Sequence, residues 1–532
     1  MAENIGGQDG SLRREVGPVA MLFTGITSII GSGWLFASLF AAQIAGPAAI
    51  ISWFIGGGVA LLLALVYAEL GGMLPFAGAI ARIPYFSHGG LSSFMAGWLC
   101  WVAYVATAPI EVTAVLQYAT NYLPWLTTTE AGDRVLTVYG LAVAAVLLAL
   151  FTGINLAGVH WLARANITVT LWKLAIPALA AIALMVAGFH SSNFTAHGGF
   201  APTGAAGVFA AVSGGGILFS FFGFRTAMDM AGEAKNPQRS VPLAMIGAVI
   251  ISLLVYLLLQ VAFIGAIPPG HLIDGWQGIS ETAAAGPFAA FAAILGMQWL
   301  ASVLYFDAVL SPSGTGLAFT AATSRINYAM AANGQFPRLF LRLNRFKVPV
   351  WALLFNFAVG LLLLLPFPGW SELVGFITSA AVLSLAFGPV SLTALRYQLP
   401  GYERPFRLTP GLVLSPICFV MTAYVVYWTG WETNWKVFLL ALVGGAALSL
   451  ACAIRKDQGE RLHARASAWF WIYVAGLAVF SYLGNYGNGL GLFSHGIDIV
   501  LLTAFSLPVF WLAVKTRLPV EQAQALVTQA SS

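Results

Sequence analysis

Glycine-rich stretches interrupt two long apolar segments of the chain. The first is Ile30-Gly31-Ser32-Gly33-Trp34. The second is Ser213-Gly214-Gly215-Gly216, followed by Ser220-Phe221-Phe222-Gly223-Phe224. Glycine costs about 1 kcal/mol against alanine in a helix interior, so we expect each helix to break there. N–H groups after a break suit a carboxylate, and carbonyl groups before it suit an ammonium group. Two facing breaks would suit a small zwitterion; the alternative is that the glycines only allow close helix packing.

Three ionisable residues, Glu111, Lys173 and Asp307, also fall within apolar segments. A charged side chain at the centre of a bilayer costs at least about 2.5 kcal/mol, so such residues are functional candidates. We interpret Lys173 as a group that loads and releases a proton, with Glu111 and Asp307 as further proton-linked groups. Alternatively, Lys173 is a structural cation bonded to carbonyl groups of the first segment, or its ammonium group extends to the membrane interface.

Three hydroxyl residues and one arginine are further candidates for a polar site within the apolar segments. Ser311, Ser313 and Thr315 lie just after Asp307 along the chain and could line the same site, or form hydrogen bonds between helices. Arg225 directly follows the second glycine-rich stretch, and its charge would favour a substrate with an anionic side chain. The alternative is that Arg225 pairs with Asp229 one turn later.

The composition identifies the environment that positions these residues. The 532 residues are 59% hydrophobic and only 8% charged, whereas soluble domains are about 25% charged. A helix crosses a bilayer with about 20 apolar residues, and the apolar runs are too long for barrel strands. We predict an all-α membrane protein with about fourteen transmembrane helices. The predicted spans are 18–45, 47–71, 94–122, 135–154, 163–188, 205–231, 241–265, 286–315, 349–366, 372–395, 411–430, 436–454, 468–484 and 496–514.

The distribution of basic residues predicts the orientation. If the N-terminus is cytoplasmic and each span crosses once, nearly all of the 24 lysines and arginines lie in cytoplasmic segments. Arg134 and Lys436 fall on the other side, and Lys173 lies within a span. We therefore expect both termini in the cytoplasm. We also expect Glu69, at the cytoplasmic end of the second span, to bond loop amides there.

Five motifs in order resemble those of the amino acid–polyamine–organocation (APC) superfamily of permeases, over residues 17 to about 410. Each motif alone is weak, but their order and their common placement are specific. They are TSIIGSGWLF (27–36), YAEL (67–70) followed by Pro75 and Ala77-Gly78, GEAKNPQRSVP (232–242), RINYAMA (325–331) followed by Gly334 and Pro337, and ERPFR (403–407).

The resemblance implies a five-plus-five inverted-repeat (LeuT-like) core with helices 1 and 6 broken, and four peripheral helices. We accordingly expect a cytoplasmic tail (1–17), a transport core of spans 1–10 (18–400), peripheral spans 11–14 (401–514) and a cytoplasmic C-terminal tail (515–532). Alternating access would expose a site midway between the broken helices to each side in turn. A lysine at the position of Lys173 is found in many proton-coupled and exchanging members.

By the same resemblance, the amides of Ser32 and Gly33, with Gly31, would hold the substrate carboxylate. Carbonyl groups near Ile29, Phe219 and Phe222 would take the ammonium group, and the two phenyl rings would close over the substrate. The alternative for each ring is ordinary packing. Many members have an acidic residue where this chain has Arg225, and that departure makes the chain similar to proton–aspartate symporters.

The resulting expectation is proton-coupled uptake of an acidic amino acid across a bacterial inner (plasma) membrane. Exchange of amino acids or amines by the same fold is the main alternative, and a channel or a membrane enzyme is a more distant one. The chain has no HExxH motif, phosphate-binding loop or histidine pair at ligand spacing. We expect an amino acid substrate, protons and lipid as partners, and no catalytic residues, metal, cofactor or nucleic acid. The sequence does not predict an oligomeric state.

Overall fold

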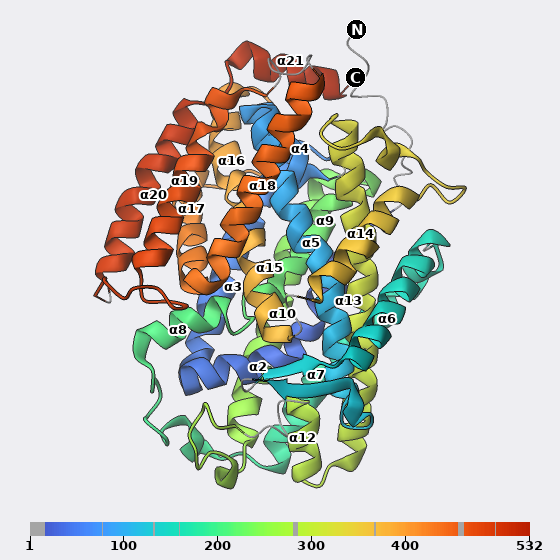
Figure 1. The fold of residues 1–532 in the computed structure, drawn as a ribbon, viewed down its shortest axis with the longest axis vertical. Coiled ribbons are helices and arrows are strands. Elements are labelled where there is room, and N and C mark those ends of the chain that lie inside the picture. Colours follow the sequence, from blue (N-terminus) through green and yellow to red (C-terminus); the bar gives the residue numbers. More distant parts are fainter. Residues whose placement is uncertain are drawn as a thin grey trace.

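The computed structural model describes residues 16–76, 78–130, 133–158, 160–279, 286–365, 369–455, 462–494 and 496–531, so residues 1–15 of the predicted N-terminal tail lie outside the described residues. Long helices dominate the molecule (Figure 1). The α-helices are α1 (Pro18–Ile29), α2 (Ser32–Ala45), α3 (Ala49–Met73), α4 (Ala79–His88), α5 (Gly90–Ala119), α6 (Val138–Leu156), α7 (His160–Ala187), α8 (Gly204–Ser213), α9 (Arg225–Asp229), α10 (Pro237–Ala266), α12 (Pro287–Ile294), α13 (Gln298–Ala332), α14 (Val350–Leu363), α15 (Trp370–Leu385), α16 (Phe387–Gln398), α17 (Gly411–Thr429), α18 (Trp431–Arg455), α19 (Ala464–Leu483), α20 (Ile497–Lys515) and α21 (Val520–Ser531). Short 3₁₀ helices are η2 (Gly46–Ala48), η3 (Pro124–Leu126), η4 (Ser191–Phe194), η5 (Phe219–Phe224), η6 (Ala231–Glu233), η7 (Pro269–His271) and η8 (Arg338–Leu341).

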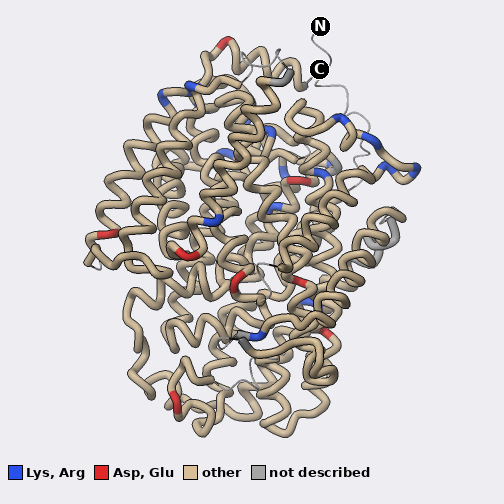
Figure 2. Tube along the Cα trace, viewed as in Figure 1, with Lys and Arg blue, Asp and Glu red and all other residues tan. Residues whose placement is uncertain are grey.

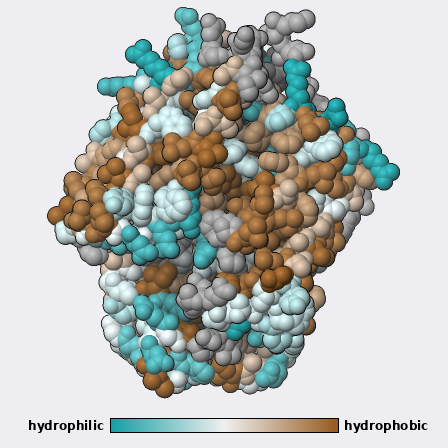
Figure 3. All heavy atoms as spheres, in the orientation of Figure 1, coloured by the Kyte–Doolittle hydropathy of each residue, from teal (hydrophilic) through white to brown (hydrophobic). Residues whose placement is uncertain are grey.

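Ten helical segments of the described chain are long and apolar enough to cross a membrane, and three shorter apolar helices accompany them. Hydrophobic side chains form a broad band across the middle of the face in Figure 3, and hydrophilic ones gather mostly toward its two ends. A helix satisfies its own backbone groups without water, which makes it the form an apolar segment must take in lipid. The chain is a multi-pass membrane protein, and the number of fourteen crossings stays a prediction.

Most helices follow the predicted spans, but α4 and α21 lie outside every predicted span, and α13 continues to Ala332, well beyond the predicted end at 315. The span predicted at 286–315 is two helices, α12 and α13, separated by a turn in which Gly296 has a φ of 79°. The all-α prediction also misses a hairpin, in which β1 (Thr127–Glu130) pairs antiparallel with β2 (Asp133–Leu136). The expected fourth span therefore begins after β2 rather than inside it. Threonine-rich β1 has the β-branched composition that favours a strand.

A central group of helices surrounds the two interrupted segments. Helix α10 packs against α1 and α3, while α5 packs against α13 and α15. Helices α17, α19 and α20 pack together and form one side of the molecule, drawn in orange and red in Figure 1. Helix α17 joins this group to the rest through contacts with α15, α16, α3 and α8.

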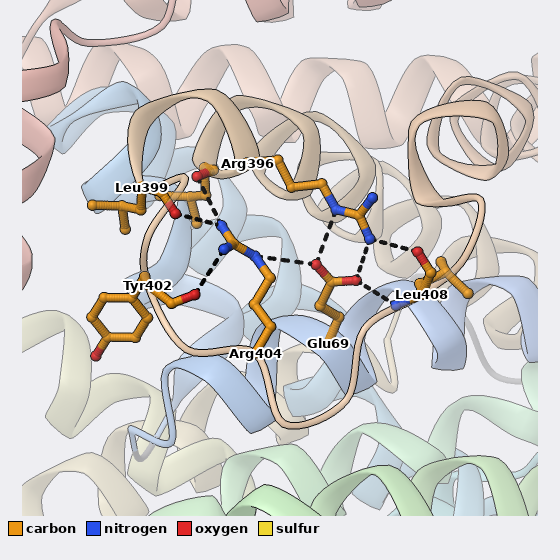
Figure 4. Close-up of polar contacts among 7 residues, drawn as sticks. Glu69, Arg396, Leu399, Tyr402, Arg404 and Leu408 are labelled. Atoms are coloured by element: carbon orange, nitrogen blue, oxygen red, sulfur yellow. Dashed lines mark hydrogen bonds and ion pairs between the residues drawn. The ribbon is translucent and has the colours of Figure 1, made fainter.

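Glu69, near the end of α3, organises a buried ion-pair cluster (Figure 4). Its carboxylate accepts from Nε and Nη2 of Arg396 at 3.0 and 2.6 Å, and lies 3.4 Å from Nε of Arg404. It also accepts from the backbone amide of Leu408 at 2.7 Å. The predicted bond to a loop amide is present. The ion pairs with the two arginines were not predicted. Burial lowers the pKa of the Arg404 guanidinium, which the Glu69 carboxylate partly counteracts.

The segment around residues 513–518 contacts α4, the helix that connects α3 to α5. The backbone amide of Leu518 donates to the carbonyl of Ser87 at 2.9 Å, and Gln398 donates to the carbonyls of both residues. The buried ring of His88 contacts the Ala513 carbonyl through Nε2 at 3.0 Å. Most of the lysines and arginines drawn in blue in Figure 2 lie in the upper half of the view, the end where Figure 1 shows α21.

Candidate functional site

The first break separates α1 from α2 at the predicted glycines. Helix α1 ends at Ile29, and Gly31 takes φ and ψ values of −123° and −134°, outside any helix. The backbone amide of Ser32, at the start of α2, donates to Oε2 of Glu111 at 2.8 Å. A protein carboxylate therefore already occupies an amide that the resemblance assigns to the substrate carboxylate.

The second break lies between α8 and α9. Gly216 has a φ of 80°, a left-handed backbone conformation that other residues rarely adopt, and η5 follows it. The two breaks are in direct contact, because a β-carbon on Gly223 would overlap the backbone of Ser28 and Ile29. The hydroxyl of Thr226 donates to that of Ser28 at 3.1 Å. The predicted pair of facing interruptions is present.

Tyr256 of α10 joins the two breaks, and it was not among the predicted site residues. Its hydroxyl lies 3.1 Å from the carbonyl oxygen of Ile29 and 3.3 Å from that of Ser220. The Ile29 carbonyl, a predicted acceptor for the substrate ammonium group, therefore already has a protein donor. The predicted acceptor at Phe222 likewise accepts from Nε of Arg225 at 3.1 Å. Each carbonyl also accepts from a backbone amide, Ile29 from Gly31 at 3.0 Å and Phe222 from Arg225, so an ammonium group must displace a protein donor to bind either one.

A small cavity lies between the breaks. Predicted residues on its wall are Ile29, Gly33, Glu111, Phe219, Phe222 and Thr315. Ser28, Thr107, Gly223, Phe319 and Ile377 complete the wall and were not predicted. Gly31 is packed beside it, because a β-carbon there would lie 2.8 Å from both Oε1 of Glu111 and Oγ1 of Thr315. Backbone groups, hydroxyls and a carboxylate thus face one apolar-walled space.

Lys173 lies beside this cavity, fully buried on α7. Its ammonium group donates to the carbonyl oxygen of Thr27 at 2.8 Å and to Oγ1 of Thr315 at 2.9 Å. This geometry matches the predicted bond to a carbonyl of the first span and is incompatible with an ammonium group at the membrane interface. Whether the ammonium group also exchanges a proton stays a prediction.

Asp307 of α13 belongs to a neighbouring polar group rather than to the cavity wall. Its Oδ1 accepts from Nε1 of Trp172 at 2.7 Å and from the hydroxyl of Ser311, one turn later, at 2.8 Å. Ser313 is only partly buried, and neither serine lines the cavity. Of the three predicted hydroxyls of span 8, Thr315 alone reaches the cavity wall.

Arg225 is buried between two aromatic rings, with 1% of its surface exposed. Its guanidinium carbon lies 4.6 Å from the centre of the Tyr104 ring and 4.8 Å from that of Phe222. Within the described chain, its Nη1 and Nη2 atoms have no hydrogen-bond partner. The alternative partner, Asp229, instead accepts from the Tyr104 hydroxyl at 2.7 Å. Arg225 therefore contacts the cavity through Phe222 rather than lining it.

Trp370, the first residue of α15, closes the other side of the site. Its indole N–H donates to the hydroxyl of Ser32 at 2.9 Å. Its ring stacks on Phe40, with centroids 5.3 Å apart, and meets Phe219 edge-on at 5.9 Å. Trp370 connects both breaks to α15, and nothing in its local sequence distinguishes it from a packing residue.

Comparison with known proteins identifies the family. A family model described as amino acid permease matches residues 16–448, which include both breaks, Lys173 and the Glu69 cluster. The chain belongs to the amino acid permease family. The permease is thus a membrane transport protein for amino acids and not an enzyme.

Two relatives from Bacillus subtilis (strain 168) match almost the entire permease. The glutamate/serine transporter AimA is 40% identical over 512 residues, which cover 95% of this chain and 94% of the relative. An aspartate-proton symporter is 37% identical over 515 residues, which cover 96% of this chain and 98% of the relative. Human cationic amino acid transporter 4 is 29% identical over 409 residues, covering 73% and 60%.

Proposed function

We propose that the permease takes up an acidic amino acid together with protons by alternating access. The observation that carries the choice of substrate is the buried guanidinium of Arg225, whose two terminal nitrogens have no hydrogen-bond partner within the described chain. Leaving two nitrogens of a buried guanidinium without hydrogen bonds is costly, and a carboxylate is the group that would satisfy them best. The printed names of two relatives, for glutamate/serine and aspartate-proton transport, support this class of substrate.

In this proposal, the substrate lies between the two breaks, where the cavity of about 10 Å³ must widen to admit it. Its α-carboxylate lies at the start of α2, near the amides of Ser32 and Gly33. Its ammonium group lies near the carbonyls of Ile29, Phe219 and Phe222, and its side-chain carboxylate points toward Arg225. Since Phe222 stands between Arg225 and the cavity, its ring must turn aside for this contact.

Proton coupling belongs in this proposal to the buried ionisable groups beside the cavity. Lys173 contacts Thr27 of the first break, Glu111 contacts Ser32, and Asp307 interacts electrostatically with Lys173. A substrate that displaces or neutralises any of them changes the protonation of the others, since buried charges that interact electrostatically titrate together.

The arrangement around the site is also part of the proposal. Residues 18–400 would form the inverted-repeat core and 401–514 the peripheral spans, in the bacterial plasma membrane with both termini in the cytoplasm. The basic residues described above favour this orientation. Cysteine labelling from the two sides of the membrane would test it.

Transport by reconstituted protein tests the function. Liposomes preloaded with unlabelled L-aspartate should accumulate labelled L-aspartate by counterflow, and an inward proton gradient should drive accumulation into unloaded liposomes. L-glutamate should compete well, while L-lysine should not. Strong competition by neutral amino acids with none by L-glutamate would refute an acidic substrate. Counterflow without any effect of the proton gradient would favour the exchanger instead.

A further inference from the structure

Glu111 brings a carboxylate of the protein to the amide that the proposed substrate carboxylate requires. Its Oε2 atom accepts from the Ser32 amide at 2.8 Å, and the side chain is 1% exposed. Glu111 comes from α5, whereas Ser32 begins the 14-residue helix α2. The same carboxylate lines the cavity with Gly33 and Phe219. Glu111 therefore both bonds the first break and forms part of the wall of the site.

One backbone N–H makes one strong hydrogen bond, so two carboxylates cannot both hold the Ser32 amide. The start of α2 carries partial positive charge and favours an anion there. In the structure, that anion belongs to the protein. A substrate carboxylate can take this place only if Glu111 leaves it.

We propose that Glu111 substitutes for the substrate carboxylate when the carrier is empty, and that it gives up the Ser32 amide by binding a proton. This inference rests on the proposed function. The proton comes from solution, binds a carboxylate oxygen of Glu111, and returns to solution on the other side of the membrane. The substrate carboxylate then accepts from the Ser32 amide, and no covalent bond between heavy atoms changes.

The charges around the break favour this exchange. The groups that face Glu111 are Lys173 from α7, Tyr256 from α10 and Thr315 from α13, and Asp307 lies earlier in α13, before Thr315. In the empty carrier, the negative charge beside Lys173 belongs to Glu111. With substrate bound, Glu111 is neutral and the substrate carboxylate supplies that charge. The net charge buried in the membrane is the same in both states, which avoids the cost of an unpaired charge there.

The replacement of Glu111 by substrate at the Ser32 amide affects whether the permease can work as a symporter or only as an obligatory antiporter. A symporter must return empty across its cycle, and an uncapped α2 N-terminus buried without water would oppose that step. Glu111 supplies the missing cap. Without it, only substrate-loaded carriers would reorient easily, and the permease would exchange amino acids without net uptake.

Two substitutions distinguish the role of Glu111 as hydrogen-bond acceptor at the start of α2 from its role as proton carrier. Glu111→Ala removes both, so net uptake and efflux of labelled L-aspartate should fall about tenfold or more, while counterflow stays near the wild-type rate. Glu111→Gln keeps an oxygen acceptor for the Ser32 amide but carries no titratable proton. It should retain downhill flux and lose accumulation driven by a proton gradient. Glu432→Gln, at the start of α18, is the matched control and should behave as wild type.

Wild-type net flux in Glu111→Ala, or intact gradient-driven accumulation in Glu111→Gln, would overturn the inference. If wild-type protein shows no amino acid counterflow, the proposed function itself fails. If the variants do not fold, the wild-type protein still gives a test in weakly buffered solution with a pH indicator. L-aspartate binding should take up about one proton per substrate bound, and binding without proton uptake contradicts the proposal.

Discussion

The ammonium nitrogen of Lys173 lies 2.8 Å from the carbonyl oxygen of Thr27, in the last turn of α1 before the break. This bond ties α7 to the interrupted helix at a point where the backbone lacks its regular partners. It also sets a positive charge beside the cavity that contains Glu111.

Lys173→Ala should abolish uptake driven by a proton gradient and leave equilibrium binding of L-aspartate largely intact. Without the ammonium group, the Glu111 carboxylate loses its counter-charge and no longer releases a proton within the cycle. Gradient-driven uptake and scintillation-proximity binding measure the two properties separately. Lys515→Ala, at the end of α20, serves as the control, and unchanged uptake in Lys173→Ala refutes the role.

Arg225→Ala should weaken competition by L-aspartate far more than competition by L-alanine, by about tenfold or more if a charge-assisted hydrogen bond is lost. The reason is the absence of any other hydrogen-bond partner for its terminal nitrogens within the described chain. Arg345→Ala, whose guanidinium lies over Phe346, provides the comparison. An equal loss for both amino acids would indicate a gating role instead of selectivity.

Gly223→Ala should abolish transport and lower the melting temperature, because the added methyl group would overlap the backbone of Ser28 and Ile29. A backbone cannot move aside as a flexible side chain can, and overpacking typically costs about 1–3 kcal/mol. Gly58→Ala in α3 is the matched control, since its β-carbon would meet nothing within 4 Å. A Gly223→Ala protein with normal transport would show that the two breaks are not packed this closely.

Glu69→Gln should destabilise the permease strongly, by about 3–5 kcal/mol, as expected when one partner of a buried ion pair is removed. Glu69 is fully buried, and Arg396 and Arg404 would lose their shared carboxylate. Thermal unfolding followed by tryptophan fluorescence gives the shift. Glu521→Gln, in α21, should change little, and a Glu69→Gln melting temperature equal to wild type would contradict the cluster's stabilising role.

His88 should make stability depend on pH between about 6.5 and 4. Burial lowers the pKa of His88 from 6.5 to about 4, so the unfolded chain binds a proton in this interval that the folded protein does not. The stabilisation is fully present above pH 6.5 and is lost as the pH falls toward 4. His88→Gln should flatten this part of the melting-temperature profile, and identical slopes in wild type and His88→Gln would refute the assignment.

The breaks and Lys173 were predictable because glycine runs and charges stand out in apolar sequence. The contact between Glu111 and Ser32 was not, because a span's position along the chain does not define which way each of its side chains points. Tyr256 and Trp370 were hidden among 16 tyrosines and 17 tryptophans, most of which have ordinary packing as an explanation. The β-hairpin was missed because its polar strands are short and adjoin an apolar span.

The contact between His88 and Ala513 joins residues 425 positions apart in the chain. A polypeptide is made from its N-terminus, so Nε2 of His88 has no Ala513 carbonyl, and the Ser87 carbonyl has no Leu518 amide, until residues 513 to 518 have been made. Until the ribosome completes the last segment, the connection between α3 and α5 lacks part of its support. A nascent permease that stalls before residue 513 would thus lack the contacts that hold α4 to this segment.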